Sequence, residues 1–178
     1  AVPVYGILMY IDGIVQSLLY GMCDSLQPAV GYNWGARLYS RVKSIEKCCF
    51  GAAGIFSLIS AVVIFAFPKA VTELFMGNAG EDFMLIAVGA VRLFSLTYIT
   101  RWISFASQSY MLAIEKPAPA SAISISISLV FPLLFIAVLW PLGLTGMWLN
   151  LAAASVASAV LSVVILIKFT GINVRKGI

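Results

Sequence analysis

The stretch "QPAVGYNWGARLYSRVK", residues 27–43, lies between two long apolar segments and decides how the chain is divided. Pro28 cannot donate a backbone hydrogen bond, so it should end the helix before it. Gly31 and Gly35 permit tight backbone turns. Tyr32 and Trp34 suit the headgroup region of a bilayer, where amphipathic rings gather. Cations follow at Arg37, Arg41, Lys43 and Lys47. The stretch therefore predicts a turn between two membrane-spanning segments.

The composition agrees with a membrane protein. Of the 178 residues, 62% are hydrophobic and 10% are charged, and the mean hydropathy is +1.04. Soluble domains carry about 25% charged residues. A soluble protein with a very large core is the alternative, but the apolar runs are too long for it.

Five segments are long enough to cross a bilayer, since about 20 residues span its ~30 Å hydrocarbon core. The expected spans are 4–26, 45–67, 83–112, 119–140 and 144–169. The stretch "SAISISISLVF", residues 121–131, alternates like a strand, but an open strand in lipid leaves its backbone unpaired. We expect a helix, with Ser121, Ser124 and Ser128 on a face that another helix approaches closely, and a kink at Pro132. The predicted fold class is an all-α, polytopic transmembrane helix bundle.

The basic residues predict the orientation. Placing the first loop in the cytoplasm puts most Lys and Arg on that side, which is the positive-inside pattern. The cytoplasmic residues are then Arg37, Arg41, Lys43, Lys47, Lys116, Lys168, Arg175 and Lys176, against Lys69 outside. The first span runs inward and the C-terminus is cytoplasmic, in a plasma or inner membrane. This placement also explains the net charge of +4, so the lipid bilayer is the expected partner and nucleic acid is not.

Several kinds of chemistry are disfavoured. The chain has no histidine, which removes Ser-His-Asp triads and histidine metal sites. Cys23, Cys48 and Cys49 form no CxxC pair, and the last two are too close for an ordinary disulfide. The carboxylates are scattered along the sequence. We expect no enzyme, no metal and no cofactor.

Two acidic residues in the first span are candidate site residues. Asp12 lies mid-span, where a charge costs about 2.5–3.5 kcal/mol even on a lenient scale. Gln16 is one turn away on the same face, so the pair suggests a carboxylate that binds H⁺ or Na⁺. The alternatives are a satisfied structural pair, or a position nearer the external interface. Asp24 lies about 120° around the helix from Asp12, so it would act separately, or pair with Arg37 or cap loop amides.

The third span holds two arginines nine residues apart, which an ideal helix places on opposite faces. We expect Arg92 to reach toward Asp12 inside the bundle, while one arginine of the two could instead extend to the interface. Tyr98, Trp102 and Gln108, with Met111, are candidates to line a cavity for flat cations. Packing or lipid-facing roles are the alternative for these residues.

The order of short motifs resembles a known family. "GMCDSLQPAVGYNWGAR", residues 21–37, resembles the helix-end signature G…QP…G-Y-N-x-G-A-[KR] of the multidrug and toxin extrusion (MATE) family. "FPKAVTELFMGN" (67–78), "AVRLFSLTY" (90–98) and "GLTGMWLNLAAASVAS" (143–158) resemble later segments of the same family in the same order. The resemblance covers nearly the whole chain.

The resemblance implies that the chain is most of a C-terminal half, helices eight to twelve of twelve, with an N-terminal half as its partner. The start at "AVPVYG", without Met, fits a piece of a longer protein. The implied function is a secondary antiporter that exports amphiphilic, cationic compounds in exchange for H⁺ or Na⁺, in a bacterial inner membrane. The alternatives are a flippase or exporter of lipids or lipid-linked glycans from the same superfamily, and a structural membrane subunit.

Overall fold

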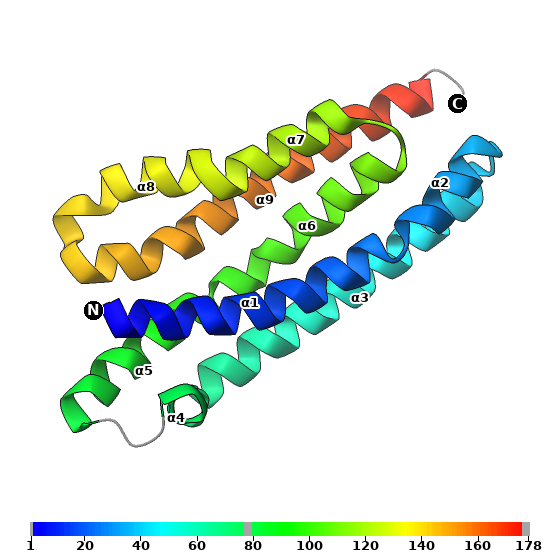
Figure 1. Cartoon of the computed structure of the whole chain (residues 1–178). Helices are drawn as coiled ribbons and strands as arrows, with labels where there is room; N and C mark the ends of the chain where they lie inside the picture. Colours follow the sequence, from blue (N-terminus) through cyan, green and yellow to red (C-terminus); the bar gives the residue numbers. More distant parts are fainter. Residues whose placement is uncertain (1, 77–79, 176–178) are drawn as a thin grey trace.

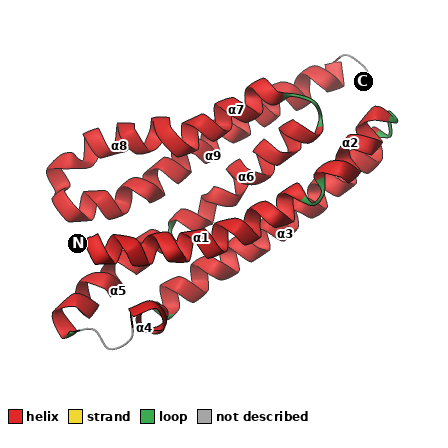
Figure 2. Cartoon of the chain, in the orientation of Figure 1, coloured by secondary structure: helices red, strands yellow, loops and turns green. Residues whose placement is uncertain are grey.

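The computed structural model describes residues 2–76 and 80–175, and within them every regular element is a helix (Figure 2). This confirms the predicted all-α membrane helix bundle. Figure 1 shows the helices running side by side as long rods. The elements are α1 (Val2–Asp24), α2 (Gln27–Gly35), α3 (Tyr39–Ala66), α4 (Pro68–Met76), α5 (Glu81–Ser95), α6 (Thr97–Ala113), α7 (Pro117–Ile125), the π-helical turn η1 (Ser126–Val130), α8 (Phe131–Leu139), the 3₁₀ turn η2 (Trp140–Leu142) and α9 (Gly143–Arg175).

Three helical stretches are long and apolar enough to cross a membrane: Pro3–Gly35, Tyr39–Ala66 and Pro117–Phe169. A fourth is possible if the bent pair α5–α6 counts as one span. The third stretch reverses direction at η2, so that α8 and α9 lie side by side (Figure 1). The assignment of five separate spans stays a prediction.

The turn predicted over residues 27–43 is shorter than expected. Pro28 occupies the first turn of a new helix, α2, where its missing N–H costs nothing. Gly31 and Gly35 are therefore helical and do not form the turn. The chain turns at residues 36–38, where Arg37 adopts a φ of 58°.

The helix α6 is central to the bundle. It contacts α1, α3, α7 and α9, and Figure 1 shows it passing between the α1–α3 pair and the α7–α9 pair. The chain bends by 42° between α5 and α6, at Leu96. The bend interrupts what the sequence suggested was one continuous helix over 83–112.

Residues 121–131 are helical, as predicted, but the serine face is not the packed one. Ser121 and Ser128 are exposed, whereas Ala120, Ile123 and Ile127 are buried. Helix contact in lipid depends on van der Waals packing, which the larger isoleucine side chains supply better. A π-helical turn, η1, lies just before Pro132, and in it the Phe131 N–H donates to the Ser126 carbonyl oxygen. The kink expected at Pro132 itself stays a prediction.

Apolar surface remains exposed along much of the bundle. Every residue of α8 keeps part of its surface exposed, including Leu133 at 58% and Val138 at 61%. A water-soluble domain rarely leaves so broad an apolar face uncovered. The surface therefore fits hydrocarbon as its solvent.

Candidate functional site

The candidate site lies where α1, α5 and α6 meet, around the carboxylate of Asp12. Asp12 is 8% exposed, and its neighbour in the sequence, Ile11, belongs to a buried cluster that also holds Phe94 of α5 and Tyr98 of α6. The Tyr98 hydroxyl donates to Asp12 Oδ1 at 3.1 Å, and Arg101 Nη1 donates to the same oxygen at 2.8 Å. The site therefore joins the middle of α1 to the first turns of α6.

Arg101 connects the carboxylate to two further groups. Its Nη2 donates to Gln16 Oε1 at 3.4 Å, and no hydrogen bond joins Gln16 to Asp12 within the described part of the chain. Its guanidinium carbon lies 5.5 Å from the centre of the Phe105 ring, a cation–π arrangement. Its Nε is buried and has no hydrogen-bond partner among the described residues.

The first turn of α6 is held from two other sides. The Ser57 hydroxyl of α3 donates to the Tyr98 carbonyl oxygen at 2.6 Å, and the Ser155 hydroxyl of α9 donates to the Thr97 carbonyl oxygen at 2.9 Å. These bonds fix the backbone just after the bend at Leu96. The fixed backbone positions the Tyr98 and Arg101 side chains so that both reach Asp12 of α1.

The ion pair determines what the site can do. The Asp12 and Arg101 side chains are 11% and 14% exposed, so both charges are largely withdrawn from water. A lone charge in this position would be costly, and removing one partner leaves the other uncompensated. A small cation that binds Asp12 must therefore compete with Arg101. The ion pair joins helices α1 and α6.

The arginine that reaches Asp12 is Arg101, and the expectation for Arg92 was wrong. Arg92 is exposed on α5 and lines a groove with Lys69 and Glu73 of α4. An ideal helix over 83–112 places the two arginines on opposite faces, and the sequence does not say which of these faces meets α1. The bend at Leu96 changes the direction of Arg101 relative to Arg92.

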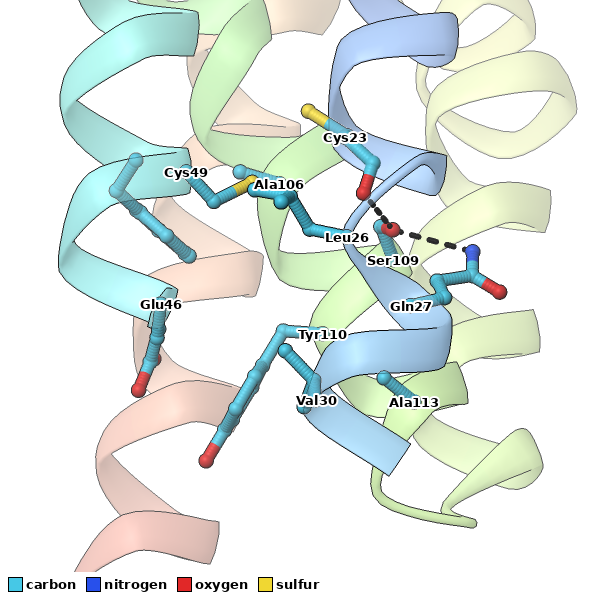
Figure 3. A pocket seen from close by; sticks show the side chains of 11 residues that line it. Cys23, Leu26, Gln27, Val30, Glu46, Cys49, Ala106, Ser109, Tyr110 and Ala113 are labelled. Atoms are coloured by element: carbon cyan, nitrogen blue, oxygen red, sulfur yellow. Dashed lines mark hydrogen bonds between the residues drawn. The ribbon is translucent and has the colours of Figure 1, made fainter. Parts of the chain in front are cut away.

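Asp24 belongs to a different environment at the end of α1. It is exposed, and its Oδ1 accepts a hydrogen bond from Gln27 Nε2 at 2.8 Å. Gln27 also donates to the Ser109 hydroxyl at 3.1 Å, which in turn donates to the Cys23 carbonyl oxygen at 3.0 Å (Figure 3). Asp24 therefore joins a hydrogen-bonded helix junction, and it pairs with Gln27 rather than with Arg37.

The residues expected to line a cavity have different surroundings. Tyr98 is 1% exposed and packs edge-on against Phe94, so it is part of the core. Trp102 lies against Gly54 of α3 and donates from Nε1 to the Ile99 carbonyl oxygen at 2.9 Å. Gln108 is half-buried, and its Oε1 has no partner among the described residues. Met111 is fully buried in a separate cluster.

The sequence analysis missed a second polar contact, between α6 and α9. Thr100 and Ser155 are hydrogen-bonded at 2.9 Å, and Ser104 donates to Ser158 at 3.0 Å. Hydroxyl residues recur three and four residues apart in both helices, and this spacing is the signal that could have revealed the contact. These bonds hold α9 against the helix that carries Arg101.

Among residues 2–76 and 80–175, no group of three histidine, cysteine or acidic side chains is arranged to hold a metal ion. The Asp12 site offers one carboxylate with one neutralising arginine.

Comparison with known proteins assigns the family. The family model MatE matches residues 1–138, which is more than half of the chain. Comparisons with curated proteins and with solved structures gave no match. The matched region contains α1 to α7, all of α8 except its last residue, and all of the Asp12 contacts described above. The chain therefore belongs to the MatE family and is a multi-pass membrane transporter of the MATE superfamily.

Proposed function

We propose that the protein is part of a secondary antiporter that exports amphiphilic, cationic compounds in exchange for H⁺ or Na⁺. The observation that carries this proposal is the buried Asp12 carboxylate, held by Arg101 and Tyr98 of another helix. A carboxylate within a membrane-spanning helix is a functional candidate by default, because burying it costs free energy.

Coupling follows from competition at Asp12. A proton or a sodium ion on Asp12 neutralises the carboxylate and weakens its contact with Arg101. The pair bridges α1 and α6, so cation binding favours an arrangement in which these helices are further apart. A ligand shifts a conformational equilibrium only through such a difference in affinity between two states.

The aromatic residues beside the pair support a cationic substrate. Arg101 lies over Phe105, and Phe105 stacks on Tyr20 with ring centres 4.2 Å apart. When Arg101 moves, the face of Phe105 becomes available to an organic cation. The cleft itself would need the N-terminal half that the family resemblance implies, with alternating access between the two halves.

The test is efflux of ethidium from a bacterium that lacks its own drug pumps, using the protein that carries this chain together with its N-terminal half. Asp12→Asn should abolish efflux at equal membrane abundance. Asp24→Asn, on the same helix, is the matched control and should leave it near wild type. Imposing a proton or a sodium gradient separately identifies the coupling ion.

Three results would overturn parts of the proposal. Gradient-driven efflux by Asp12→Asn would remove Asp12 from coupling while retaining the exporter function. Loss of efflux in Asp12→Asn with recovery in Asp12→Asn/Arg101→Gln would make the pair structural. Absence of efflux for several cationic dyes, together with flipping of a labelled lipid in proteoliposomes, would establish the flippase alternative.

A further inference from the structure

A groove beside α4 contains the arginine that the candidate site does not use. The groove has a volume of about 540 Å³, and its lining includes Lys69 and Glu73 of α4, Val88 and Arg92 of α5, and Ala66 at the end of α3. Figure 1 shows these three helices meeting at one end of the bundle. This volume lies within the ~300–1,000 Å³ range of ligand sites.

The charges in this groove favour an anion. Lys69 Nζ lies 3.8 Å from Glu73 Oε1, and these side chains are 73% and 46% exposed. An exposed pair of this kind is weak and yields readily to a competing anion. Arg92 makes no ion pair with any residue in 2–76 or 80–175. Two cations and one carboxylate therefore leave a net positive charge.

A second groove continues from the first along the bundle. Its volume is about 390 Å³, and it is lined largely by apolar residues of α3 and of the bend between α5 and α6. Ala66 lines both grooves, so the two are contiguous. The apolar lining includes Leu58, Val62, Phe65, Leu96 and Ile99.

We propose that the combined groove binds one phospholipid with an anionic headgroup. The headgroup phosphate lies between Lys69 and Arg92, and one acyl chain follows α3 toward Leu58. The charged groove adjoins the apolar groove, just as the charged headgroup of a phospholipid adjoins its apolar acyl chains. Since α3 is long and apolar enough to cross a membrane, lipid acyl chains surround the second groove, which α3 lines.

The test uses the purified protein in detergent micelles, titrated with phosphatidylglycerol and followed by native mass spectrometry. Lys69→Gln/Arg92→Gln should weaken binding on the order of 20-fold, from the usual contribution of two cations near a lipid headgroup. Lys43→Gln/Lys116→Gln removes the same charge from exposed positions outside the groove. This control should retain near wild-type affinity.

A second pair of variants tests the acyl-chain part without changing charge. Ala66→Phe should obstruct the junction of the two grooves and weaken phosphatidylglycerol binding. Ala52→Phe, at an exposed position of α3 outside both linings, should not. Phosphatidylcholine should bind more weakly than phosphatidylglycerol, and inorganic phosphate in the millimolar range should not displace the lipid.

Several outcomes would overturn the proposal. If the two double-glutamine variants weaken phosphatidylglycerol binding equally, the lipid is held by general electrostatic attraction and not by this groove. Displacement by inorganic phosphate, with no effect of Ala66→Phe, would indicate a free-anion site. If the wild-type protein does not bind phosphatidylglycerol, the lipid proposal is wrong, and a neighbouring protein segment becomes the alternative occupant of the groove.

Discussion

Asp12 and Asp24 lie on the same helix, α1, but their surroundings differ. Asp12 is 8% exposed and contacts an arginine and a tyrosine, whereas Asp24 is exposed and contacts a glutamine amide. The middle of α1 faces the start of α6, and the end of α1 is hydrogen-bonded to the far end of α6 through Ser109 and the Cys23 carbonyl oxygen, while the Asp24 side chain itself is exposed. The side chains that the partner helix presents, more than the residue type, therefore decide which carboxylate becomes a candidate site.

The largest expected effect separates the two carboxylates directly. Asp12→Asn should lower the free energy of unfolding by about 3–5 kcal/mol, because it leaves the buried Arg101 charge uncompensated. Asp24→Asn should change it by less than about 0.5 kcal/mol, as at most surface positions. Denaturation in detergent, followed by circular dichroism, measures both. Similar losses for the two variants would contradict the difference in environment.

The next prediction concerns the pair itself. Asp12→Asn/Arg101→Gln should be more stable than the sum of the two single variants implies, because no unpaired charge remains. The interaction energy from this double-mutant cycle should be about 0.5–3 kcal/mol. Strict additivity would mean that the two side chains do not interact in the membrane protein.

A smaller effect compares two serines of α3. Ser57→Ala removes a buried hydroxyl that holds the Tyr98 carbonyl, and should cost about 1 kcal/mol. Ser44→Ala removes an exposed hydroxyl that bonds within its own helix, to the Ser40 carbonyl oxygen, and should cost almost nothing. Equal thermal stabilities of the two variants would show that the clamp on α6 is unimportant.

The smallest effect compares two glycines of α3. At Gly51 a new Cβ meets open space, so Gly51→Ala should stabilise the helix by up to about 1 kcal/mol. At Gly54 a Cβ would lie 3.4 Å from the Trp102 ring, so Gly54→Ala should gain less. The difference in midpoint temperature tests this packing, and a larger gain at Gly54 would contradict it.

Much of the fold followed from physical limits on the chain. Long apolar runs and scarce charge allow helices in lipid and exclude open strands, so even the alternating residues 121–131 are helical. Asp12 and Gln16 could be chosen because a polar residue within such a run is costly. These inferences need no knowledge of neighbouring helices.

The partner of Asp12 could not be derived in the same way. Helix geometry placed the two arginines on opposite faces without saying which face meets α1, and no proline or glycine marks the bend at Leu96. The position of the turn after α1 was mispredicted for a different reason. Pro28 is compatible with the end of one helix and with the first turn of the next, and sequence alone does not separate these two roles.

The π-helical turn Ser126–Val130 separates α7 from α8, so the residues of α8 do not continue the regular α-helical spacing of α7. A π turn holds an extra residue relative to an α-helix, and one residue corresponds to about 100° of rotation. The face that α8 presents to α9 is therefore rotated from the face that a continuous α-helix would present. Deleting a single residue within 126–130 should therefore convert the π turn into regular α-helix and leave the same residues of α8 facing α9. The π turn accommodates one residue more than an α-helix would, and the shape of this turn therefore decides which residues of α8 contact α9.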